Sequence, residues 1–202
     1  MNKREIIIKT MYKLLLEDKG ASCSVSDIAK EAGIGKGSIY YYFKSKDEIF
    51  DAVVEHIYKE KIDKCKEAID NKQINALEKL KLLFDVYGQY IIEPSIDSYL
   101  HKQQNAAIHQ KSLAQILNLL SPIVADIFSE GVNENLFSCE NPQETAELFL
   151  SAFCFLLDPG IFVWSDYQVF KKIEAMSDLF EKGLSAPKGS FIFLCEKFKE
   201  QP

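Results

Sequence analysis

The residues with the clearest chemistry lie between Lys36 and Tyr42, in the run KGSIYYY. On a helix, Ile39 and Phe43 share one face four residues apart and form its buried side. The other face then presents small residues, hydroxyl groups and an ammonium. Small residues let the backbone approach a surface, and these donors suit phosphate oxygens and base edges. This face is typical of a helix that enters a nucleic-acid groove.

Three helix starts surround this run and would hold it in place. Ser24 precedes a first helix, with an acid three residues later as in a capping box. Gly33 follows as a left-handed stop, because glycine adopts that conformation without steric penalty. The second helix begins near Gly35, and Ser45 opens a third with another capping-box pattern. The pattern predicts a helix-turn-helix.

The segment DIAKEAGIGKGSIYYYFKSKDEIF resembles the DNA-binding signature of the TetR family of bacterial transcriptional regulators. The likeness spans about Arg4 to Val54. It implies that Lys36 to Tyr42 is the recognition helix and that Lys46 matches a lysine at the start of the next helix. The residues that we expect at the DNA are Ser24, Lys36, Gly37, Ser38, Tyr40, Tyr41, Tyr42 and Lys46.

Two positions depart from the family pattern. Gly35 stands where Ser or Thr is usual, so a side-chain cap and a phosphate contact are missing. Tyr42 stands where His is usual. These departures concern the operator sequence rather than the fold. The alternative is a small helical subdomain whose tyrosines merely pack against one another.

The charge distribution supports a polyanionic partner for the N-terminal part. The whole chain of 202 residues carries −6, which alone argues against nucleic acid. Residues 1–46, however, hold nine Lys or Arg against five Asp or Glu, a net charge of +4, so the remainder carries −10. A basic head on an acidic body would bind DNA through the head.

Several classes of protein are not indicated. The five cysteines are far apart and form no CxxC pair, so neither a disulfide framework nor a zinc site is predicted. No glycine-rich phosphate loop, GxSxG or HExxH motif occurs. No signal peptide or membrane-spanning segment is expected. We therefore predict a cytoplasmic protein that is not an enzyme and has no catalytic residues, cofactor or metal.

The periodicity of apolar residues predicts an all-α fold of about nine or ten helices. A three-helix head, residues 1–46, would precede a larger regulatory and dimerisation body, residues 47–202. Helix 47–71 would join the two without a flexible linker. Besides the head and this connector, we expect long helices over residues 75–93, 111–132, 142–157 and 167–184, and a shorter helix over residues 95–104.

The middle of the body combines aromatic rings with a few polar groups, which is what a small organic ligand requires. The alternative is that its tyrosines are ordinary core residues. The family resemblance implies a pocket among the body helices. The residues that we expect to line it are Phe84, Tyr87, Tyr90, Tyr99, His101, Gln104 and His109.

The run LFLSAFCFLL, residues 148–157, is apolar on every side, so a helix there must be buried on two faces. One face would pack on the chain's own core and the other on a second copy. The resemblance implies the same, because the last two long helices form the dimer interface in TetR-like proteins. A fully intramolecular core is the alternative. The interface residues that we expect are Phe149, Phe153, Leu157, Tyr167, Phe170 and Met176.

Together these features predict a homodimeric, ligand-responsive regulator. The resemblance implies a repressor that leaves a palindromic double-stranded operator when a small organic effector binds. A different hypothesis is a ligand sensor that acts through protein partners, with weak or lost DNA binding. Steep loss of duplex binding with added salt would favour the repressor. An all-helical enzyme ranks last, since no motif supports it.

Overall fold

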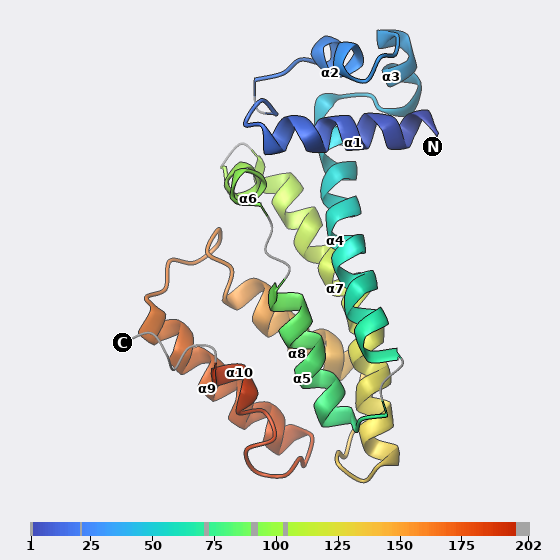
Figure 1. The fold of residues 1–202 in the computed structure, drawn as a ribbon. Coiled ribbons are helices and arrows are strands. Elements are labelled where there is room, and N and C mark those ends of the chain that lie inside the picture. Colours follow the sequence, from blue (N-terminus) through green and yellow to red (C-terminus); the bar gives the residue numbers. More distant parts are fainter. Residues whose placement is uncertain (1, 21, 71–72, 90–92, 103–104, 197–202) are drawn as a thin grey trace. The chain divides into compact units, whose positions relative to one another are not determined.

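The structure of the chain is a computed structural model that describes residues 2–20, 22–70, 73–89, 93–102 and 105–196. These residues form ten α-helices and no strand, which confirms the predicted all-α fold (Figure 1). They fall into two compact units. The first unit comprises Met1–Glu60 with Ile91–Gln115, and the second comprises Lys61–Tyr90 with Ile116–Pro202. The division after residue 46 stays a prediction.

Local capping signals set the helices of the head. Helix α1 (Lys3–Leu16) follows Asn2, whose side chain accepts a hydrogen bond from the Glu5 amide. Helix α2 (Val25–Glu31) follows Ser24 in a capping box. Helix α3 (Lys36–Tyr42) comes next, and α4 (Lys46–Asp70) begins directly after Ser45. The predicted helix-turn-helix is therefore present. Helices α2, α3 and α4 each begin directly after the residue at which the sequence predicted a helix start.

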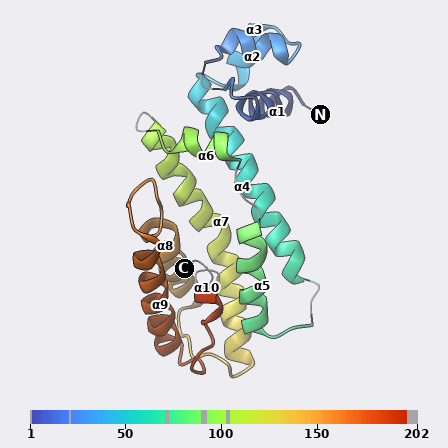
Figure 2. The ribbon, with the colours of Figure 1, turned by 60° about the vertical axis from the view of Figure 1, so that its left-hand side comes forward.

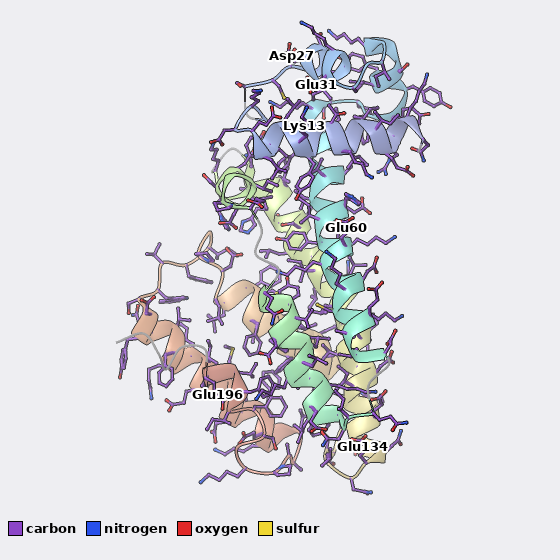
Figure 3. The ribbon with its side chains drawn as sticks, in the orientation of Figure 1. Lys13, Asp27, Glu31, Glu60, Glu134 and Glu196 are labelled. Atoms are coloured by element: carbon purple, nitrogen blue, oxygen red, sulfur yellow. The ribbon has the colours of Figure 1, made fainter. Side chains whose placement is uncertain are left out.

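A shared apolar core holds the head together. Its central side chains come from α1, α2, α3 and the start of α4, and all are fully buried: Ile7, Met11, Ile28, Ile39, Ile49 and Phe50. At the surface, Lys13 Nζ of α1 lies 2.6 Å from Glu31 Oε1 of α2 (Figure 3). Exposed pairs of this kind contribute little. Burial of the apolar core is thus the main term that holds α3 in place.

Two further segments complete the first unit. Helix α6 (Pro94–Leu100) brings the Tyr99 ring to 4.4 Å from the Phe50 ring. Helix α7 (Ala106–Asn133) begins five residues before its predicted start at Lys111. Asn105, a residue type favoured at the N-cap, stands directly before Ala106, so the sequence did contain a signal for this earlier start. By length and composition α7 could cross a membrane, yet half of its most apolar stretch is buried.

The second unit is a layered helical core. It contains α5 (Ala76–Gln89), α8 (Pro142–Leu156), α9 (Asp166–Gly183) and the short α10 (Phe193–Glu196), with the remaining turns of α4 and α7. Helices α8 and α9 lie side by side (Figure 2), and the Phe149 and Phe180 rings are 4.7 Å apart between them. Glu134, just after α7, accepts a hydrogen bond from the amide of Ala76 at the start of α5 (Figure 3).

Gly131 of α7 is a position where the core has no room for a side chain. A Cβ there would overlap Cδ2 and Cε2 of Phe137, whose ring is itself packed 5.9 Å from that of Phe128. We expect Gly131→Ala to lower the free energy of unfolding by about 1–3 kcal/mol, the usual cost of overpacking. Urea unfolding measures it. Gly183→Ala is the matched control, because a Cβ there meets no atom within 4 Å; equal losses in both variants would contradict the prediction.

Candidate nucleic-acid interface

The turn before α3 is set by backbone geometry. Gly33 has φ +65°, the left-handed conformation predicted for the end of α2. The Ile34 amide donates to the Ala29 carbonyl, which closes the end of α2. Gly35 then occupies the N-cap of α3 in an extended conformation and, having no side chain, makes no cap hydrogen bond. The amides at the start of α3 therefore lack a side-chain acceptor.

Helix α3 buries one face and exposes the other. Ile39 is fully buried and Phe43 nearly so, as predicted. The tyrosines lie on the outer side, with Tyr40 51%, Tyr41 82% and Tyr42 37% exposed. Such exposure is unusual for consecutive aromatic side chains, which normally bury most of their area. The outer face is thus available to a partner rather than to the core.

The exposed groups of α3 form an organised surface. The Tyr41 and Tyr42 rings contact each other edge to face, 4.9 Å apart. Lys36 Nζ lies 5.9 Å from the centre of the Tyr40 ring. Lys36 and Gly37 are exposed, and Ser38 is half-buried beside them. Hydroxyl groups, an ammonium and accessible backbone therefore share one short helix.

The charges near α3 remain available to an anion. Within the described part of the chain, the ammonium groups of Lys36 and Lys44 have no carboxylate within ion-pair distance. By contrast, Lys13 pairs with Glu31 and Lys19 with Glu17. Cations without an internal partner are free to neutralise phosphates.

Two other predicted DNA residues differ in their surroundings. The Ser24 hydroxyl donates to Asp27 Oδ2 at 2.7 Å and accepts from the Asp27 amide. This bond lowers the pKa of the Asp27 carboxyl, so a negative charge stays beside Ser24. Ser24 therefore acts mainly as a cap. Lys46 is half-buried in the first turn of α4.

Arg4 is a cation near α3 whose role the sequence left open. Its guanidinium lies 5.4 Å from the centre of the Phe43 ring, directly after α3. The contact joins residues 39 positions apart in the chain, so no local pattern could have revealed it. Arg4 thus adds a positive charge from α1 to the C-terminal end of α3.

The residues predicted to bind a ligand are divided between the units. Tyr99, His101 and His109 belong to the first unit, where the two imidazole rings are 4.7 Å apart. Phe84 and Tyr87 belong to the second unit. Tyr90 and Gln104 lie outside the described residues. Tyr99 is buried against Phe50, which agrees with the alternative of a core tyrosine.

The single chain exposes the predicted dimer residues to different degrees. Phe149 is fully buried and Met176 is 7% exposed within the single chain, so neither offers surface to a second copy. Phe153, Leu157 and Phe170 are half-buried, while Tyr167 is 73% exposed. The other large apolar side chains exposed on α8 and α9 are Leu148 and Leu179, at 68% and 66%.

Comparisons with known proteins agree with this arrangement. Residues 14–53 match the family model described as bacterial regulatory proteins, tetR family. Residues 94–179 match the model of the tetracyclin repressor-like C-terminal domain. The first match covers the helix-turn-helix and the second covers α6 to most of α9.

Relatives of known sequence are bacterial regulators. The uncharacterized HTH-type transcriptional regulator YvaF of Bacillus subtilis is 24% identical over 188 residues, 92% of this chain and 96% of the relative. The fatty acid metabolism regulator protein of the same species is 30% identical over 130 residues, 62% of this chain and 66% of the relative.

Solved structures share the fold. RolR in complex with resorcinol superimposes with a TM-score of 0.68 at 14% identity, covering 96% of this chain and 93% of RolR. A TetR-family regulator from Mesorhizobium loti gives a TM-score of 0.61 at 15% identity, covering 90% and 96%. TetR family models match both the N-terminal helix-turn-helix and the C-terminal helices, so the chain belongs to the TetR family of bacterial transcriptional regulators.

Proposed function

We propose that this regulator is a repressor that binds a palindromic operator through α3 and leaves it when a small organic effector binds. The observation that carries the DNA-binding part is the outer face of α3, where three tyrosines are exposed beside Lys36. The small residues of α3 would let its backbone approach the DNA closely. Its hydroxyl groups and ammonium suit the major groove. Binding to the bacterial chromosome places the protein in the cytoplasm.

The roles of the head residues follow from their chemistry. Tyr40, Tyr41 and Tyr42 would contact base edges and sugars, while Lys36 and Lys46 would bind phosphates. Gly37 and Ser38 would let the backbone approach. Lys44 and Arg4 would add phosphate contacts at the C-terminal end of α3, and Ser24 would hold α2 in register. Phosphate contacts position the head, and base contacts give it specificity.

Regulators of this family are typically dimeric, and a two-fold dimer would place two copies of α3 in successive major grooves about one helical turn apart. An effector would favour a conformer whose heads no longer fit that spacing. This mechanism requires tighter effector binding to the conformer that releases DNA. RolR, which shares the fold, binds resorcinol; a comparably small organic molecule is our proposal for this chain.

The test is binding of the purified protein to operator DNA, with the region beside its own gene and randomised duplexes as probes. We expect Tyr41→Ala to weaken specific binding by about 1–3 kcal/mol, through loss of a base contact. Lys36→Ala should weaken binding to all duplexes and lower the slope of log K against log salt by about one. Fluorescence anisotropy at several salt concentrations measures both.

Lys188→Ala is the matched control, because Lys188 is exposed and lies outside the head. A folded protein that selects no duplex from the randomised pool at low salt would contradict the repressor. That result would favour the sensor that acts through protein partners.

A further inference from the structure

Lys61 of α4 is a partly shielded lysine of the second unit for which the described residues provide no counter-ion. The residue is half-buried, and its Nζ lies 3.7 Å from the centre of the Tyr87 ring of α5. Within the described part of the chain, no carboxylate lies within ion-pair distance of it. A π-face offsets part of the lost hydration of an ammonium, but it does not replace an anion.

The neighbouring thiols cannot supply that anion. Cys65, one turn further along α4, and Cys154 of α8 both interact electrostatically with Lys61. Burial raises the pKa of each thiol to about 11, so both stay protonated at neutral pH. Burial also lowers the pKa of Lys61 to about 8, which leaves most of its amine charged at pH 7.

Another shielded lysine of the same unit shows the contrast. The Lys79 side chain is only 17% exposed, and its Nζ lies 2.5 Å from Glu130 Oε2. There the chain itself pairs a shielded ammonium with a carboxylate. At Lys61 it provides an aromatic ring and two neutral thiols instead. The arrangement around Lys61 is therefore that of a cation whose partner comes from outside the chain.

The surroundings of Lys61 also suit the rest of a ligand. Phe84 lies one turn before Tyr87 on α5, and its ring is 5.5 Å from that of Phe153, the residue before Cys154. The Tyr87 ring of α5 thus adjoins the ammonium, and the Phe84–Phe153 pair continues the aromatic side chains along α5 and α8. An apolar body would pack against such rings, while a few polar groups fix its orientation.

We infer that Lys61 binds the carboxylate of a small organic acid with an apolar body, and that this acid is the effector class of the protein. The inference rests on the proposed function, because it names the ligand of the same regulator. In the bound state the carboxylate pairs with the ammonium of Lys61, and the apolar body contacts the aromatic side chains of α5 and α8.

The test uses 4-phenylbutanoate as the probe and 4-phenylbutanamide as its neutral counterpart, each titrated calorimetrically into the full-length protein. We expect the acid to bind and the amide to bind at least tenfold more weakly. Lys61→Met should lose at least tenfold in affinity for the acid, and Lys61→Arg should retain most of it. Lys81→Met, at an exposed lysine of α5, is the control and should match the wild type.

The pH dependence provides a second readout. Near neutral pH both the carboxylate and the ammonium are charged, and affinity should fall as the pH rises above 8, where Lys61 of the free protein loses its proton. Lys61→Arg should show no such fall, because arginine stays charged. Lys61→Met should not lose stability at pH 7 without ligand, since it removes an uncompensated charge.

Two outcomes overturn the inference: no binding of the acid by the wild type, or equal binding by Lys61→Met. Operator binding by the same samples without ligand separates this failure from that of the proposed function. Retained operator binding with no role for Lys61 would contradict only the proposed effector class. Absent operator binding would contradict the proposed repressor, whatever Lys61 binds.

Discussion

Phe149→Ala is expected to lower the free energy of unfolding by about 3–5 kcal/mol, the range for removal of a buried phenylalanine. The side chain is fully buried at the centre of the second unit. Its ring lies between 4.7 and 5.9 Å from five others, those of Phe84, Phe128, Phe153, Phe180 and Phe191. Phe149→Ala would leave a cavity among these rings. The rings belong to several helices and the C-terminal segment, so they cannot all move inward to fill it.

Urea unfolding followed by circular dichroism measures the loss. Leu148→Ala, measured at a concentration where the protein is monomeric, is the control, because Leu148 precedes Phe149 on α8 but is 68% exposed in the single chain. Its cost to the protomer should stay below about 1 kcal/mol. A loss under 1 kcal/mol for Phe149→Ala would show that the neighbouring rings do collapse into the space. The pair separates a core position from a surface position one residue apart.

The head could be predicted closely because its signals are local. Ser24, Gly33 and Ser45 each mark a helix end through hydrogen bonds or a backbone conformation that involve residues at most five positions away. Ile39 and Phe43 identify the buried face of α3 by spacing alone. Where the decisive interactions lie within one turn of chain, residue type and position are sufficient.

The body was harder to predict because its decisive contacts are distant. The run around Phe149 is apolar on every side, so periodicity could not tell the core face from the surface face. Asn141 directly precedes α8, but its side chain makes no cap hydrogen bond. Lys61 gave no signal at all, because an exposed and a shielded lysine look the same in a helical pattern. Its environment depends on α5 and α8, which only the fold brings to α4.

In the proposed dimer, Leu148→Glu is expected to separate the two protomers and to weaken operator binding on the order of 100-fold, through loss of linked binding by two heads. Leu148, Tyr167 and Leu179 are large apolar side chains on α8 and α9 that the single chain leaves mostly exposed. Exposed apolar side chains grouped on neighbouring elements mark an interaction surface. A carboxylate at Leu148 would be buried without a partner in the dimer, which is costly.

Sedimentation velocity over a range of concentrations measures the dissociation, and anisotropy with the selected operator measures the affinity. Leu16→Glu is the control for sedimentation, because Leu16 is an exposed apolar residue of α1 and should leave the dimer intact. In dilute solution, the unfolding free energy of Leu148→Glu should match that of the wild-type protomer, because the Leu148 side chain makes few contacts within its own chain. A Leu148→Glu protein that remains dimeric would place the interface away from this part of α8, and the two heads would then need a different spacing on DNA.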